Sequence, residues 1–194
     1  MPADAINLSQ VRRVLVTKLR HHGDVLLASP VLSALKASAP RLEIDALVYA
    51  DTADMLDGHP DLSQLHCIDR SWKKLGLMGQ GSAEWALFSA MKSRQYDLVI
   101  HLTEHPRGAW LSRLLKPRWS VAPRVNGRGR FWKNSFTHFV SPIMGSGRRH
   151  VVEQNLDALR RLGVQPAADQ RALTFVPGAD ADAHVAVRLQ SVSY

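Results

Sequence analysis

The chain has 194 residues, of which 45% are hydrophobic, and a formal net charge of +8 at pH 7. This length suits one α/β domain that folds without disulfide or metal cross-links, and it argues against two full domains. The single cysteine, Cys67, excludes an intrachain disulfide and favours a reducing compartment. Nothing after Met1 has the charged and then apolar pattern of a signal peptide, and no apolar run approaches the roughly 18 residues that span a bilayer. We therefore expect a soluble, cytoplasmic protein.

A strand, a polar turn and a helix are predicted near the start of the chain. Val14–Val16 is a short apolar run rich in β-branched residues, typical of a parallel strand covered on both faces. The dipeptide Gly23-Asp24 marks the turn, and the apolar spacing predicts a helix over 25–39. Either Asp24 caps this helix, or Ser29 caps it with Pro30 at the first helical position. Because the turn follows the carboxyl end of a strand, it lies where open α/β sheets bind ligands.

The remaining pattern alternates strands with helices. The predicted elements are a strand over 43–49, a short helix over 51–58, a strand over 65–68, a mobile loop over 71–81, a helix over 82–94, a strand over 96–102, a short helix over 108–115, a strand or extended segment over 119–125, a Gly-rich basic loop over 126–133 and a helix over 150–162. This order indicates a Rossmann-like α/β fold, an open and mostly parallel sheet with helices on both faces. The carboxyl end of the strand over 96–102 should lie beside that of the first strand.

The positive charge is concentrated in one segment. Between Glu104 and Glu153 there is no Asp or Glu, yet this stretch holds 10 of the 25 basic residues. A run of charge is often only a solvated surface. Its length here favours contact with an anionic ligand, since arginine forks bind phosphate and carboxylate groups through two parallel hydrogen bonds.

Three blocks of sequence resemble the heptosyltransferases of glycosyltransferase family 9, which add heptose to the lipopolysaccharide inner core. The blocks are KLRHHGDVLLASPVLSALK over 18–36 with EIDALVY over 43–49, YDLVIHLTEH over 96–105, and WKNSFTHFVSP over 132–142 with HVVEQNLDALRRLG over 150–163. The double histidine before Gly-Asp is closer to the third type, which adds a branch heptose. The resemblance implies the N-terminal, acceptor-binding domain of a GT-B glycosyltransferase over 1–178 and the start of an interdomain helix over 179–194, with the C-terminal donor-binding domain absent from this chain.

Asp24 is the candidate catalytic base. Transfer of a sugar to a hydroxyl with inversion needs a base within hydrogen-bond reach of that hydroxyl, and a carboxylate at a strand-to-helix turn suits this. An ordinary Asp pKa of about 3.9 makes a weak base, so closure over the acceptor must desolvate the carboxyl and raise its pKa. The resemblance implies the same role for the Gly-Asp carboxylate. The alternative is that Asp24 only caps a helix.

Ten residues are candidates for acceptor binding, because they are basic, polar or close to the two predicted strand ends. They are Lys18, Arg20, His22, Gly23, Thr103, Glu104, Arg128, Arg130, Lys133 and His138. Glu104 is also a second candidate base. A solvated basic turn, or Glu104 as a helix cap or ion-pair partner, would explain some of them without a ligand. Adjacent histidines in an extended segment point apart, so no shared metal is expected at His21 and His22.

The resulting hypothesis is transfer of heptose from ADP-heptose to the heptose of the lipopolysaccharide inner core, by inverting direct displacement and without cofactor or metal. The expected partners are this phosphorylated, acidic glycolipid, the donor held by the missing domain, and the inner membrane, contacted peripherally at its cytoplasmic face; no nucleic acid is expected. The alternatives are a nucleic-acid-binding module that uses the basic segment 107–149 with Phe131 and Trp132, or a remnant that binds the glycolipid without turnover. Measuring how binding depends on the sugar of the ligand would distinguish these hypotheses.

Overall fold

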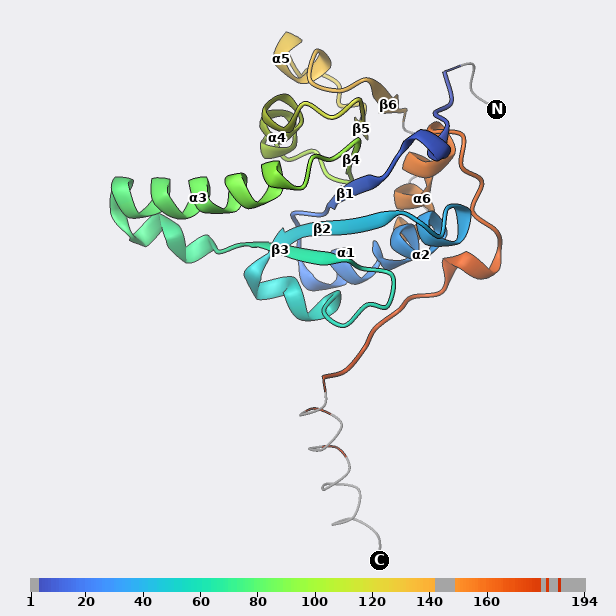
Figure 1. Cartoon of the computed structure of the whole chain (residues 1–194), viewed down its shortest axis with the longest axis horizontal. Coiled ribbons are helices and arrows are strands. Elements are labelled where there is room, and N and C mark those ends of the chain that lie inside the picture. Colours follow the sequence, from blue (N-terminus) through green and yellow to red (C-terminus); the bar gives the residue numbers. More distant parts are fainter. Residues whose placement is uncertain (1–3, 142–148, 179–180, 182–184, 186–194) are drawn as a thin grey trace, which may run out of the picture.

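The computed structural model describes residues 4–141, 149–178, 181 and 185. It contains a six-stranded sheet in the order β3-β2-β1-β4-β5-β6, in which every pair of neighbouring strands is parallel (Figure 1). This is the strand order of the doubly wound Rossmann fold. The predicted fold class is therefore confirmed.

The strands are short and most of their residues are buried. They are β1 (Arg13–Thr17), β2 (Glu43–Tyr49), β3 (Gln64–Ile68), β4 (Leu98–His101), β5 (Trp119–Pro123) and β6 (His138–Val140). In the central strand β1, Val14 lies opposite Ile44 on one side and Leu98 on the other. The chain winds outward from β1 through β2 and β3, then returns to β4 and winds the other way. The order reverses between β1 and β4, which creates the switch point where such sheets bind ligands.

Helices cover both faces of the sheet. They are α1 (His22–Leu26), α2 (Ser29–Ser38), α3 (Gly76–Ser93), α4 (Arg107–Leu115), α5 (Arg130–Lys133) and α6 (Val151–Arg161), with 3-10 turns η1 (Leu8–Gln10), η2 (Ala50–Met55), η3 (Arg70–Lys74) and η4 (Asp169–Arg171). Helices α1, α2 and α6 lie on one face, and α3 and α4 on the other (Figure 1). Within the described residues, no helix is long and apolar enough to cross a membrane.

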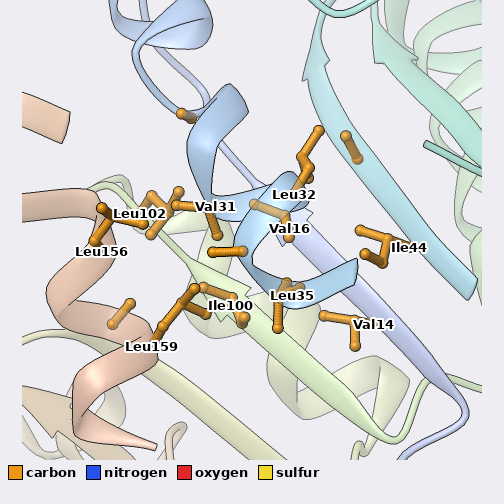
Figure 2. Close-up of a cluster of buried hydrophobic side chains, with 14 of the residues drawn as sticks. Val14, Val16, Val31, Leu32, Leu35, Ile44, Ile100, Leu102, Leu156 and Leu159 are labelled. Carbon is orange, nitrogen blue, oxygen red and sulfur yellow. The ribbon is translucent and has the colours of Figure 1, made fainter. Parts of the chain in front are cut away.

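The larger hydrophobic core lies beneath α2 and α6. Figure 2 shows Val14, Val16 and Ile100 from the sheet meeting Leu35 of α2 and Leu159 of α6, and the same residues are fully or almost fully buried. Because both faces of the sheet are covered, its strands alternate between two cores and read as continuous apolar runs.

The first predicted helix is wrong in its extent, since it is divided into α1 and α2. Pro30 has no N–H to donate to the carbonyl of Leu26, so the α-helical ladder is interrupted and restarts. Neither predicted cap is observed: Ala28 is the N-cap of α2, and Asp24 lies inside the first turn of α1. The Ser29 hydroxyl instead accepts a hydrogen bond from the N–H of Thr174, at 3.1 Å.

The predicted mobile loop over 71–81 is also wrong, because η3 and the first turns of α3 occupy it. The glycines that indicated a loop are within or next to a helix. A Cβ on Gly79 would lie 2.8 Å from the Cβ of Leu75, so glycine allows a close contact at this helix start. In the predicted basic loop, the last four residues form α5. The expected interdomain helix over 179–194 lies outside the described residues except for Ala181 and Val185, both of which are helical.

Candidate active site

A cavity of about 340 Å³ opens at the carboxyl edge of the sheet, beside the switch point between β1 and β4. Its walls come from the segments that follow β1, β4, β5 and β6, and from α6. The lining residues are Lys18, Arg20, Asp24, His101, Leu102, Thr103, Glu104, Pro123, Arg124, Val140, Ser141, Arg149, Val151, Gln154, Asn155, Asp157 and Ala158. The volume and the polar lining suit a sugar or another small polar ligand.

Asp24 lies in the first turn of α1, partly buried, and its side chain lines this cavity. Among the described residues, no hydrogen bond or ion pair within 4 Å engages its carboxylate. The group is therefore available to accept a proton or a hydrogen bond from a ligand. Of the sequence candidates, the cavity brings Asp24 together with Lys18, Arg20, Thr103 and Glu104.

Lys18 is the buried cation of the cavity, with only 5% of its surface exposed. Its ammonium donates hydrogen bonds to Oδ1 of Asn155 at 2.9 Å and to the carbonyl of Leu102 at 3.3 Å. Burial lowers the pKa of Lys18 to about 8, and the negative charge of Asp24 opposes this shift. At neutral pH the ammonium is still mostly protonated, so a positive charge is held close to Asp24.

Asn155 connects three elements at this point. While its Oδ1 accepts from Lys18, its Nδ2 donates to the carbonyl of Leu27 at 2.8 Å, which ties α6 to the break between α1 and α2. Sequence analysis missed this bridge. The only signal was that Asn155 belongs to one of the blocks resembling the heptosyltransferases.

His101 at the end of β4 is fully buried, and sequence analysis also missed it. Its Nε2 donates to the carbonyl of His105 at 3.0 Å, so Nδ1 accepts from the hydroxyl of Thr17. Burial lowers the pKa of His101 to about 4, which keeps the ring neutral at physiological pH. The hydroxyl of Thr103 lies 3.2 Å from the same Nε2. His101 therefore fixes the turn that presents Thr103 and Glu104 to the cavity.

The free positive charge in the cavity comes from Arg20 and Arg124. Among the described residues, neither guanidinium has a carboxylate partner within 4 Å, and that of Arg124 lies 5.9 Å from the centre of the Phe139 ring. Arg149 is different, because it pairs with Asp157 at 2.6 Å and Glu153 at 3.5 Å. Two arginines without an ion-pair partner in the described part of the chain therefore line the cavity with Asp24 and Glu104.

Several sequence candidates lie outside the cavity. Arg128 reaches its rim, where it donates to the backbone carbonyl of Glu104 at 2.7 Å. His138 is buried at the start of β6, with Nε2 3.0 Å from the carbonyl of Asp4. The others are exposed and do not line the cavity: His22, Gly23, Arg130 and Lys133. The basic segment is thus spread over several elements, and only part of it faces the candidate site.

The aromatic residues of that segment have structural contacts. Trp132 is 4% exposed and packs against His101 and Phe136, with ring centroids 6.0 Å and 5.0 Å away. Phe131 is partly exposed and packs against Trp110, with centroids 4.6 Å apart. A buried Trp132 cannot stack on a nucleobase, which removes half of the aromatic support for a nucleic-acid module. Among the described residues, no group of three or more His, Cys, Asp or Glu side chains is arranged to hold a metal ion.

An all-parallel sheet in this order, with a polar cavity at its switch point, defines a Rossmann-like ligand-binding domain. No family model matches the chain. It is 36% identical to lipopolysaccharide heptosyltransferase 3 of Escherichia coli over 160 residues, which are 82% of this chain and 45% of that protein. For the heptosyltransferase 3 of strain K12 the identity is 37% over 147 residues, 75% of this chain and 41% of that protein. The chain therefore spans less than half the length of the curated relatives it matches.

Solved structures agree on the fold. A family 9 glycosyltransferase from Veillonella parvula superposes with a TM-score of 0.76 at 19% identity, over 98% of this chain and 52% of the other. The E. coli heptosyltransferase WaaC with ADP-2-deoxy-2-fluoro heptose gives 0.67 at 21% identity, over 80% and 50%. The E. coli heptosyltransferase II gives 0.62 at 14% identity, over 93% and 51%. These comparisons confirm the resemblance to lipopolysaccharide heptosyltransferases, and this chain corresponds to their N-terminal part.

Proposed function

We propose that this chain is the acceptor-binding part of an enzyme that transfers heptose from ADP-heptose to the heptose of the lipopolysaccharide inner core, at the cytoplasmic face of the inner membrane. The observation that carries the proposal is the cavity at the switch point, where Asp24 faces a polar space with Arg20 and Arg124, and none of these three groups has an ion-pair partner among the described residues. The names of the relatives supply the substrate class: heptosyltransferase 3 acts on lipopolysaccharide, and WaaC is described with an ADP-heptose analogue.

In the proposed reaction, Asp24 takes the proton from the attacking hydroxyl of the acceptor. The acceptor oxygen forms a bond to the anomeric carbon of the donor heptose as the bond from that carbon to the ADP phosphate oxygen breaks. ADP leaves with the bonding electron pair, and the anomeric configuration inverts. Thr103 presents a hydroxyl to the acceptor sugar, while Glu104 stays the second candidate base.

Binding of the acceptor is assigned to the unpaired cations. Arg20 and Arg124 can each hold a phosphate or carboxylate group through two parallel hydrogen bonds, and neither has to give up a carboxylate partner among the described residues to do so. Arg130 and Lys133 lie outside the cavity and are not needed for this contact. The domain boundary at residue 178 and a donor-binding domain beyond it are part of the same proposal.

The test is a transfer assay with ADP-heptose and a phosphorylated inner-core oligosaccharide, read by mass spectrometry. The chain is assayed alone and together with the C-terminal half of E. coli heptosyltransferase 3, added as a separate polypeptide. We expect Asp24→Asn to lower the rate at least about 100-fold, as for loss of a general base, and Arg130→Ala to leave it unchanged. An unchanged rate in Asp24→Asn refutes the catalytic assignment. Acceptor binding without product under both conditions favours a binding-only remnant.

A further inference from the structure

Helices α3 and α4, with Leu75 directly before α3, carry many exposed apolar side chains. This α3–α4 surface is defined by Leu75, Leu77, Met78, Trp85, Trp110 and Leu114. Leu77 is 92% exposed, Met78 91% and Trp85 67%. Exposed apolar patches on a protein surface mark places where something else binds.

Packing against the rest of the chain leaves most side chains of α3 partly or fully exposed. Of its 18 residues only Met91 is buried. Leu87 and Phe88 line a second cavity of about 440 Å³ between α3 and α4, while Leu77, Met78 and Trp85 are exposed to solvent. In Figure 1 the first half of α3 projects past the edge of the sheet. A helix with apolar residues on more than one side needs a second apolar environment besides the core.

The charges around this surface are mainly positive. Lys73 and Lys74 are exposed in η3, directly before α3. Arg113 of α4 has its guanidinium 4.7 Å from the centre of the Phe131 ring and no carboxylate within 4 Å among the described residues. The one acidic residue of α3 and α4 is Glu84, which pairs with Arg107 at 3.3 Å. Exposed Leu, Met and Trp side chains flanked by lysines match the headgroup region of an anionic bilayer.

The surface adjoins the candidate active site. The loop between β4 and α4 forms a wall of both cavities: Thr103 and Glu104 line the site, and His105 and Pro106 line the groove between α3 and α4. A glycolipid whose acyl chains remain in a bilayer at the α3–α4 surface could therefore place its sugars in the neighbouring site.

We propose that the α3–α4 surface docks the chain on an anionic lipid bilayer. Leu77, Met78 and Trp85 insert at the headgroup level, and Lys73 and Lys74 contact lipid phosphates. The inference rests on the proposed function only for the identity of the glycolipid acceptor, because lipid docking can be measured without it.

The test is flotation of the purified chain with phosphatidylcholine vesicles, with and without phosphatidylglycerol. We expect binding to the anionic vesicles, weaker binding at high ionic strength, and a partition coefficient at least about tenfold lower in the triple variant Leu77→Ser, Met78→Ser, Trp85→Ser. Lys73→Ser with Lys74→Ser should weaken binding to anionic vesicles only. Circular dichroism checks that each variant is folded.

Matched controls come from elsewhere on the chain. The apolar control, Leu173→Ser with Phe175→Ser, removes side chains after α6 that are 45% and 49% exposed. The charge control, Arg12→Ser with Arg41→Ser, removes two exposed cations just before β1 and β2, at the amino ends of these strands. Both controls should bind vesicles as the parent does.

The inference is overturned if the parent does not float, if the triple variant floats equally well, or if that variant only changes the oligomeric state. Oligosaccharide binding, measured on the same variants, should stay intact whether or not docking is lost, so failure of docking and failure of the proposed function are distinguishable.

Discussion

Lys18 illustrates how a single buried residue can determine the electrostatics of the candidate site. Its ammonium is held by Asn155 and by the carbonyl of Leu102, and it lies close enough to Asp24 for each charge to affect the other. Lys18 therefore places a positive charge beside the carboxylate that we propose as the base.

The burial of Lys18 also predicts how stability depends on pH. Because burial lowers the pKa of Lys18 from 10.5 to about 8, the unfolded chain binds more protons than the folded chain between these values. Stability contributed by this group therefore rises as the pH increases from 8 towards 10.5, by at most about 3 kcal/mol. Urea unfolding of the parent and of Lys18→Met between pH 7 and pH 10 measures the difference. Parallel profiles in the two proteins would contradict the assignment.

At the scale of elements, the contact between β4 and α4 depends on a glycine. A Cβ on Gly108 would lie 2.2 Å from the ring of His101, which is fully buried and hydrogen-bonded at both nitrogens. Because hydrogen bonds at both nitrogens hold the ring in place, a Cβ at this distance would push the two elements apart. The close approach of α4 to β4 thus requires glycine at position 108.

We expect Gly108→Ala to lower the free energy of unfolding by about 1–3 kcal/mol or more, as overpacking does in other cores. Gly129→Ala is the matched control, because a Cβ there meets no atom within 4 Å and its φ is −69°. Thermal or urea unfolding gives the comparison. In the His101→Ala background the cost of Gly108→Ala should fall sharply, and an equal cost in both backgrounds would refute the steric explanation.

At the scale of the whole molecule, the periodicity of the sequence was sufficient to predict β1 to β5 and the longer helices in their order, while α5 and β6 were not predicted. Buried parallel strands such as Glu43–Tyr49 have continuous apolar runs, and amphipathic helices such as α6 have a regular stripe. The errors have local causes. Glycines near residue 76 indicated a loop although α3 begins there, and Pro30 divides one predicted helix into two.

The site could be predicted only in part. Asp24 and Thr103 were found because they follow predicted strands, and the order of parallel strands brings their ends together. Asn155 and His101 were missed because their partners lie 137 and 84 residues away in sequence, at Lys18 and Thr17. The basic segment looked like one surface, but His138 is buried at the start of β6 and Arg149 forms ion pairs with Glu153 and Asp157.

The central claim is that the cavity at the switch point binds an acidic sugar acceptor, and calorimetric titration with a phosphorylated inner-core oligosaccharide tests it most directly. The parent is compared with Arg124→Ala, which removes a cation from the cavity, and with Arg130→Ala, which removes an equal charge outside it. We expect Arg124→Ala to weaken binding about tenfold or more and Arg130→Ala to have little effect. A single-stranded RNA of matched charge should bind no more tightly than its charge alone predicts. Equal losses in the two arginine variants, or tight RNA binding without oligosaccharide binding, would contradict the account.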